Sequence, residues 1–314
     1  MARALVFPGQ GSQAVGMGKE LAEAFAVARE TFEEVDEALQ QSLSRLMFAG
    51  PDDELTLTEN AQPALMAVSI ATLRVLQHQG GFQVAAQAQC VAGHSLGEYS
   101  ALTAAGTLTL GDAARLLKIR GQAMQKAVPV GVGAMAALLG ADLEAAQAIA
   151  QEAAQGEVCA CANDNAPGQV VVSGHKGAVE RAMRIAAERG FKRSVMLPVS
   201  APFHCPLMQP AADRMAEALA AVRLEAPAVP LIANVTAAAV SEPDAIRNLL
   251  VEQVTGMVRW RESVLAMKAQ GVDTLVEVGT GKVLAGLTKR IDKEVAALSL
   301  NTPAEIEAFL KTVS

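Results

Sequence analysis

The run Gln89-Cys90-Val91-Ala92-Gly93-His94-Ser95-Leu96-Gly97 contains the pattern that decides the fold. Its first four residues predict a short buried strand, and a helix is predicted over residues 97–105. The five residues from Gly93 to Gly97 match G-x-S-x-G, in which a serine occupies a sharp strand-to-helix turn. There the backbone N–H of Leu96 would face an oxyanion. Ser95 is therefore the candidate nucleophile; the alternative is a chance match.

Strands and helices alternate on both sides of this turn. The patterns predict strands over residues 3–7, 229–233, 274–278 and 295–299, and helices that include 17–39, 61–79 and 112–127. Such alternation predicts an α/β fold in which helices cover both faces of a mostly parallel sheet.

The middle of the chain has a different order. Residues 128–198 predict β-α-β-β-α-β, the order of a small ferredoxin-like domain, with a turn over residues 163–168. We therefore predict a large domain formed by residues 1–127 and 199–314, with a small domain inserted at 128–198.

Composition excludes several classes of protein. The chain has 314 residues, of which 51% are hydrophobic, so we expect a packed globular protein. Its formal net charge of −7 argues against binding to nucleic acid. Four cysteines form no disulfide framework. Without an apolar run of roughly 20 residues or a signal-peptide pattern, we expect no membrane association and a cytoplasmic location.

A nucleophilic serine needs a base, and the chain has four histidines. His78 and His175 are predicted near helix ends, and His94 is adjacent to Ser95, so its side chain should leave the turn in another direction. His204 lies in a proline-rich loop after the small domain and is the candidate base. The alternative is an ordinary loop histidine.

No aspartate between Ser95 and His204 stands plainly at a strand end of the larger domain, where it could complete a hydrolase triad. The last carbonyls of a helix lack partners within it, so the predicted helix that ends near residues 252–254 could orient the imidazole instead. A neutral carbonyl stabilises imidazolium less than a carboxylate does, and such a serine need not be primed to react with water.

Arg120 is the most informative charged residue. It lies at the centre of the apolar stripe of the predicted helix 112–127, between Leu117 and Met124. Burial of a guanidinium without an anion is costly. Arg120 therefore either makes a structural salt bridge or binds a carboxylate of the ligand through its planar fork.

The loop Gly9-Gln10-Gly11-Ser12-Gln13 follows the first strand. It lacks both the Walker lysine and the dinucleotide spacing, so we expect it to supply a second N–H to an oxyanion rather than to hold a phosphate. The four cysteines do not form a convincing zinc site, and we expect no metal.

Taken together, these motifs resemble the malonyl-CoA:acyl-carrier-protein transacylases of bacterial type II fatty acid synthesis. The resemblance covers essentially the whole chain and depends on six segments in order: Phe7–Gln13, Gly93–Ala101, Arg120-Gly121, Asn165–Gln169, Phe203-His204 and Val251–Gln253. It implies an α/β-hydrolase-like core with a ferredoxin-like insertion.

The resemblance also implies roles for single residues. Ser95 would carry the acyl group, and His204 would be the base. The backbone N–H groups of Gln10 and Leu96 would form the oxyanion hole. Arg120 would bind the malonyl carboxylate.

It further implies that the main-chain carbonyl of Gln253 orients the histidine. Phe203 matches the malonyl-selecting form of the motif.

The implied reaction transfers malonyl from malonyl-CoA to the phosphopantetheine thiol of acyl carrier protein without a metal or redox cofactor. Alternatives are the malonyltransferase component of malonate decarboxylase, a stand-alone polyketide acyltransferase and, less well matched, a serine esterase.

The acidic carrier could dock on a basic part of the small domain. Residues 175–195 contain two carboxylates and six cations, which are Lys176, Arg181, Arg184, Arg189, Lys192 and Arg193. The alternative is a solvated helix face.

Overall fold

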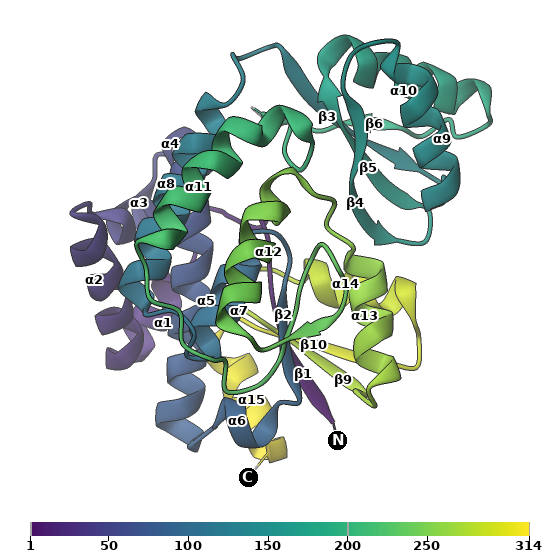
Figure 1. Ribbon diagram of the computed structural model, residues 1–314. Helices are drawn as coiled ribbons and strands as arrows, with labels where there is room; N and C mark the ends of the chain where they lie inside the picture. Colours follow the sequence, from purple (N-terminus) through teal and green to yellow (C-terminus); the bar gives the residue numbers. More distant parts are fainter. Residues whose placement is uncertain (1, 200, 314) are drawn as a thin grey trace.

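A computed structural model describes residues 2–199 and 201–313 (Figure 1). The larger sheet in this part of the chain has the strand order β10-β9-β1-β2-β7-β8. All neighbouring strands are parallel except β7 and β8, which confirms the predicted mostly parallel sheet. Its strands are β1 Arg3–Phe7, β2 Cys90–Gly93, β7 Leu231–Ile232, β8 Ala239–Val240, β9 Thr274–Val278 and β10 Ala296–Leu300.

The smaller sheet has the order β4-β5-β3-β6, with every neighbouring pair antiparallel. Its elements are β3 Gly133–Leu139, α9 Leu143–Ala154, β4 Cys159–Ala166, β5 Gln169–His175, α10 Lys176–Glu188 and β6 Val195–Met196. They follow the β-α-β-β-α-β order that the sequence predicts, beside the larger sheet in Figure 1. The exact domain boundaries stay a prediction.

The predicted turn over residues 163–168 is wrong in extent. Strand β4 continues to Ala166, so that only Pro167 and Gly168 separate it from β5. The backbone of Asn163 pairs with that of Val258, and Asp164 N–H donates to the Val258 carbonyl at 2.9 Å. A distant segment therefore keeps this polar run extended.

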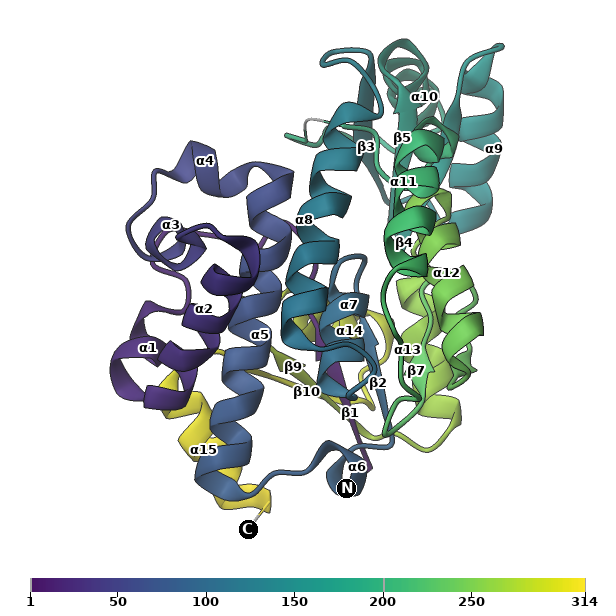
Figure 2. The same cartoon turned by 60° about the vertical axis from the view of Figure 1, so that its left-hand side comes forward.

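Helices cover both faces of the larger sheet, as Figures 1 and 2 show. They are α1 Lys19–Ala24, α2 Ala26–Leu39, α3 Leu43–Ala49, α4 Asp52–Thr56, α5 Thr58–Gly80, α6 Val84–Gln87, α7 Gly97–Ala104, α8 Leu110–Lys126, α11 Gln209–Ala220, α12 Pro243–Thr255, α13 Trp260–Ala269, α14 Val283–Ile291 and α15 Pro303–Val313, with a short 3₁₀ helix at Pro206–Met208. The single helix predicted over 17–39 is two helices, because Phe25 has extended backbone between α1 and α2.

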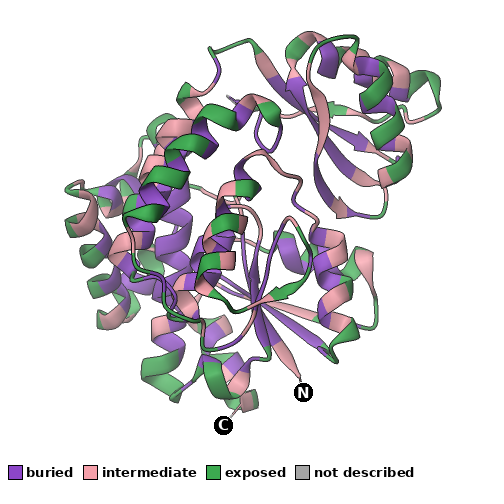
Figure 3. Cartoon of the chain, viewed as in Figure 1, coloured by how far each residue is buried: buried purple, intermediate pink, exposed green. Residues whose placement is uncertain are grey.

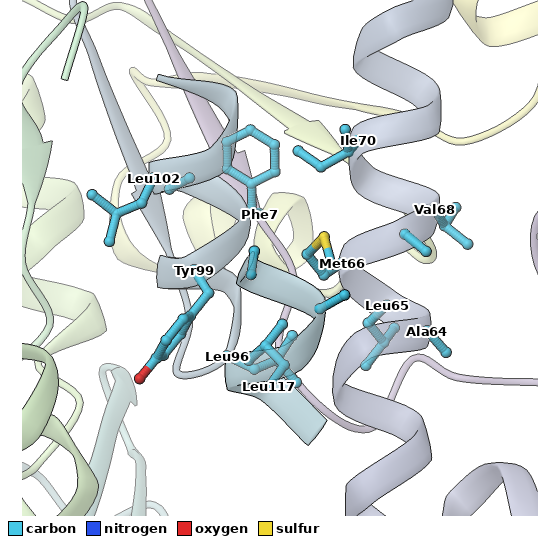
Figure 4. Packing of buried hydrophobic residues seen from close by; sticks show 14 of the residues in the cluster. Phe7, Ala64, Leu65, Met66, Val68, Ile70, Leu96, Tyr99, Leu102 and Leu117 are labelled. Atoms are coloured by element: carbon cyan, nitrogen blue, oxygen red, sulfur yellow. The ribbon is translucent and has the colours of Figure 1, made fainter. Parts of the chain in front are cut away.

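Strand β1 shows how both faces are buried. Leu5 and Phe7 belong to the core that includes α5, α7 and α8, whereas Ala4 and Val6 pack with residues of α13 and α14 on the other face. Figure 3 shows the strands of the larger sheet as mostly buried and the helices around it as buried on part of their surface. Helix α5 belongs to the core on the Leu5 and Phe7 side of the sheet. Figure 4 shows its Leu65 and Met66 beside Leu117.

The two glycines of the G-x-S-x-G turn permit very close backbone packing. A Cβ atom on Gly93 would lie 1.9 Å from the carbonyl carbon of Gly97, and one on Gly97 would lie 2.3 Å from the carbonyl oxygen of Phe7. The turn therefore closes on itself and on the end of β1, which explains why both flanking positions require glycine.

This packing gives a test. Gly93→Ala should lower the free energy of unfolding by about 3 kcal/mol or more, since backbone atoms must move to admit the methyl group. Gly286→Ala in α14 is the control, because nothing lies within 4 Å of its added Cβ. It should be neutral or stabilising by about 0.5–1 kcal/mol. Urea unfolding measures both, and equal effects of the two substitutions would contradict the packing argument.

Candidate active site

Ser95 stands at the tip of the strand-to-helix turn with a φ of 54°, in the left-handed region. Two side chains satisfy its backbone there. Asn234, which follows β7, accepts from Ser95 N–H at 2.8 Å and donates to the Gly93 carbonyl at 2.6 Å. Gln253 of α12 donates to the Ser95 carbonyl at 2.9 Å. The strained residue is thus held by partners from two other elements.

His204 is close enough to act as the base for Ser95. Its Nε2 lies 2.8 Å from Ser95 Oγ, and its Nδ1 lies 2.8 Å from the Gln253 carbonyl oxygen and 3.1 Å from that of Gly256. Because carbonyls only accept, Nδ1 carries the proton and Nε2 is free to accept one from the serine. Within the described residues, neither ring nitrogen contacts a carboxylate.

The environment keeps this imidazole neutral. Burial lowers the pKa of His204 to about 3, and the positive charge of Arg120 acts in the same direction. Hydrogen bonds to the Gln253 and Gly256 carbonyls raise the pKa and oppose these effects only in part. The base form of His204 is therefore populated well below neutral pH.

The side chain of Arg120 extends from α8 to Ser95, and only 1% of the surface of this residue is exposed. Its Nη2 donates to Ser95 Oγ at 3.1 Å and to Gln253 Oε1 at 2.9 Å, while its Nη1 donates to Gln62 Oε1 at 2.8 Å. The face of Tyr99 lies 5.7 Å from the guanidinium carbon. All these partners are uncharged.

The structural salt bridge considered for Arg120 is not present among the described residues. Its Nε, moreover, has no hydrogen-bond partner there. A buried guanidinium with only neutral partners favours an anion from outside the protein, because burial of an unpaired charge is costly.

A pocket of about 700 Å³ opens in front of these residues. Gln10, Ser95, Arg120 and His204 line it from the loops and helices around the larger sheet, and Met135 lines it from β3 of the smaller sheet. This volume lies within the usual range for small-molecule sites.

The loop after β1 brings Gln10 to the turn. A Cβ atom on Gly9 would lie 2.8 Å from the His94 carbonyl oxygen, so the two backbones are in contact. In the described part of the chain, the N–H groups of Gln10 and Leu96 have no protein acceptor. Both are therefore free to donate, and their role in binding an oxyanion beside Ser95 stays a prediction.

Sequence reasoning missed three residues of the site. Asn234 and Glu98 are buried polar residues that hold the turn, and Gln62 holds Arg120. A polar residue directly after a buried strand was the signal for Asn234, and a carboxylate within an apolar helix was the signal for Glu98. Nothing in the sequence alone places Gln62 against Arg120.

Two other expectations concern metals and membranes. Over residues 2–199 and 201–313, no group of three or more His, Cys, Asp or Glu side chains could hold a metal ion. In the same ranges, no helix is both long and apolar enough to cross a membrane. The cytoplasmic location stays a prediction.

Comparisons with known proteins find acyl transferases as relatives along nearly the whole chain. The model of the acyl transferase domain matches residues 4–301. The chain is 49% identical to the malonyl CoA-acyl carrier protein transacylase of Escherichia coli (strain K12), over 98% of each protein. It is 45% identical to that of Bacillus subtilis (strain 168), over 99% of this chain and 96% of the relative.

Solved structures extend this agreement to three dimensions. The acyl-carrier-protein-S-malonyltransferase from Bartonella henselae superposes with a TM-score of 0.97 at 56% identity, over 100% of this chain and 99% of that one. A malonyl-transacylase solved in complex with its type II PKS acyl-carrier protein gives a TM-score of 0.96 at 44% identity, over 99% and 100% of the two chains.

The low pKa of His204 predicts an unusual pH dependence. Modification of Ser95 by a fluorophosphonate should keep its rate as the pH falls from 8 to 5, because the imidazole loses its base form only near its lowered pKa of about 3. In Arg120→Ala the repelling charge is gone, so the pKa of His204 rises and the rate should fall at a higher pH. Circular dichroism at each pH verifies folding. A wild-type midpoint near 6.5 would show that His204 is not buried as described.

Proposed function

The chain belongs to the acyl transferase family, among the malonyl-CoA:acyl carrier protein transacylases, and we propose that it transfers malonyl through an ester on Ser95. One observation carries this proposal: Ser95 Oγ lies 2.8 Å from His204 Nε2 and 3.1 Å from Arg120 Nη2. A base and a cation suited to a carboxylate thus meet at one nucleophile.

The first half of the reaction loads the serine. His204 Nε2 accepts the Ser95 proton while Oγ attacks the thioester carbonyl of malonyl-CoA. The backbone N–H groups of Gln10 and Leu96 bind the tetrahedral oxyanion. When the C–S bond breaks, His204 returns its proton to the leaving CoA sulfur, and malonyl remains as an ester on Ser95.

The second half runs through the same groups. His204 accepts the proton of the phosphopantetheine thiol of acyl carrier protein, and the sulfur attacks the ester carbonyl. The oxyanion again lies against Gln10 and Leu96. The C–O bond then breaks, and His204 returns the proton to Ser95 Oγ. The atoms balance in both halves without a metal or a redox cofactor.

Arg120 explains why the site would prefer a malonyl group to an acetyl group. Its Nη2 already lies beside Ser95 Oγ, so the carboxylate of an acyl group on the serine would be within its reach. A guanidinium holds a carboxylate by two parallel hydrogen bonds. Acetyl ends in a methyl group and would leave this buried charge unpaired, which favours malonyl.

The alternatives have less support. A serine esterase would be expected to orient its histidine with a carboxylate, whereas His204 contacts two carbonyls. The malonate decarboxylase component and a stand-alone polyketide acyltransferase would share this site. Relatives that match at 45–49% identity over nearly their full length are named malonyl CoA-acyl carrier protein transacylases, which favours the transacylase reaction.

Mass spectrometry tests the ester directly. After incubation with malonyl-CoA, the peptide containing Ser95 should carry one malonyl group, and Ser95→Ala should carry none. His204→Ala should slow acylation by about 10²–10⁴-fold, as loss of a positioned base does. An adduct on Cys205 or another residue of Ser95→Ala would contradict the assignment, as would an unchanged rate in His204→Ala.

Within the six cations predicted to dock the carrier, the structure distinguishes two groups. Arg181 pairs with Glu157, and Arg189 pairs with Glu152, inside the small domain. Lys176, Arg184, Lys192 and Arg193 have exposed side chains.

The position of these cations relative to the pocket indicates which of them could contact a carrier whose acyl group enters the pocket. Helix α10 packs on the face of the smaller sheet that carries Ala136, opposite to the face with Met135 in the pocket. Lys192 and Arg193 lie in the segment that leads through β6 to Leu197 in the pocket wall. We infer that this end of the predicted patch contacts the acidic carrier.

Charge reversal tests this surface. Lys192→Glu combined with Arg193→Glu should raise KM for acyl carrier protein several-fold, more at low salt, and leave acylation by malonyl-CoA unchanged. Lys293→Glu is the control: Lys293 precedes β10, at the end of the sheet away from Ser95. An unchanged KM for the carrier in the double variant would place the docking surface elsewhere.

A further inference from the structure

The side-chain amide of Gln253 lies between Arg120 and a group of acceptors. Its Oε1 accepts from Arg120 Nη2 at 2.9 Å. Its Nε2 donates to the Ser95 carbonyl at 2.9 Å and to Glu98 Oε2, with Asn234 Oδ1 at 3.3 Å. Gln253 is fully buried, so water cannot replace any of these partners.

An amide has an acceptor end and a donor end, and this site accepts only one orientation. If the amide of Gln253 were flipped, Nε2 would face the N–H groups of Arg120, donor against donor. Oε1 would then face the Ser95 carbonyl and the Glu98 carboxyl, acceptor against acceptor. The orientation that anchors Arg120 therefore depends on the acceptors at the other end.

Glu98 supplies the ionisable acceptor at the donor end of the Gln253 amide. It lies in the first turn of α7, three residues after Ser95, and is 1% exposed. Its Oε2 accepts from Gln253, and its Oε1 accepts from the backbone N–H of Asn234 at 3.3 Å. One carboxyl group thus contacts both residues that hold Ser95 in its strained turn.

Glu98 does not line the pocket and does not touch Ser95 Oγ, so it cannot act on substrate directly. Burial raises the pKa of Glu98 to about 8, whereas hydrogen bonds from Gln253 and Asn234 and the charge of Arg120 lower it. The amide of Gln253 also separates this carboxyl group from the guanidinium. Arg120 therefore forms no direct ion pair with Glu98.

We propose that Glu98 is a positioning residue for malonyl recognition, because it fixes the Gln253 amide in the orientation that holds Arg120 beside Ser95. The inference rests on the proposed function for its substrate. It adds a chain of contacts, from Glu98 through Gln253 to Arg120, that links the first turn of α7 to selectivity for the acyl group.

Glu98→Gln keeps the shape of the side chain and should break this chain of contacts. Gln253 Nε2 and Asn234 N–H each need an oxygen of residue 98 as acceptor. Both oxygens of a carboxyl group have lone pairs that can accept, whether or not the group is protonated, and a glutamine there offers only one oxygen. Its NH₂ group would face one of the two donors and compete with the observed amide orientation. Arg120 would then lose its fixed position.

The experiment measures kcat/KM for malonyl-CoA and acetyl-CoA in wild type, Glu98→Gln, Arg120→Ala and the double variant. In Glu98→Gln, the malonyl-to-acetyl ratio should fall by about 10-fold or more, the scale of one charged hydrogen bond. In the Arg120→Ala background, Glu98→Gln should cause no further loss of the ratio, because its effect passes through the arginine.

The matched control is Glu277→Gln. Glu277 is also a fully buried carboxylate in the large domain, but it accepts from the N–H groups of Leu284 and Ala285 at the start of α14. Its substitution should lower stability and leave the ratio unchanged. Gln253→Met keeps the main-chain carbonyl for His204 and should reproduce the loss of the ratio, which provides a second variant if Glu98→Gln folds poorly.

The outcomes separate the two proposals. If Glu98→Gln lowers kcat/KM equally for both substrates, or lowers the malonyl-to-acetyl ratio further in the Arg120→Ala background, Glu98 does not act through Arg120. The inference is then wrong. If Arg120→Ala itself leaves the ratio unchanged, the role of Arg120 in the proposed function fails, whatever Glu98 does.

Discussion

The left-handed backbone of Ser95, with a φ of 54°, is the constraint around which this site is arranged. A left-handed conformation costs a non-glycine residue roughly 1–2 kcal/mol, so other contacts must hold it. Asn234 and Gln253 bind its backbone groups, and the close approach of Gly93 to Gly97 leaves the turn no room to relax. These contacts come from separate elements, so the serine is exposed to the pocket only when the whole sheet has assembled.

Burial determines the electrostatic state of the other two groups beside Ser95, which are His204 and Arg120. Burial lowers the pKa of His204, and the partners of the buried Arg120 are all neutral. In water both effects would be small, because solvent would stabilise imidazolium and screen the guanidinium. Burial therefore gives the site a neutral base and a cation without an anionic partner, at a cost in folding free energy that the hydrophobic core must offset.

The small domain supplies part of the pocket wall, and a short segment of β4 attaches this domain to the rest of the structure. In β4, the backbone of Asn163 pairs with Val258, the buried Asp164 forms an ion pair with the partly exposed Arg261 at 2.8 Å, and Asn165 Oδ1 lies 2.8 Å from His94 Nε2. Three successive polar residues thus attach the smaller sheet to α13 and to the residue beside the nucleophile. This attachment fixes the position of Met135 and Leu197 in the pocket wall.

The sequence by itself determined the parallel core, the order of elements in the small domain, and the residue types at Ser95, His204 and Arg120. These features follow from periodicity and from glycine spacing, which act over a few neighbouring residues. The tertiary structure decided what depends on distant partners. It extended the run at 163–166 into a strand, because Val258 pairs with it, and it gave Arg120 amides instead of a carboxylate. It also brought Glu98, Asn234 and Gln253 together, because buried polar groups must find partners wherever the packed fold places them, and sequence spacing carries no record of that choice.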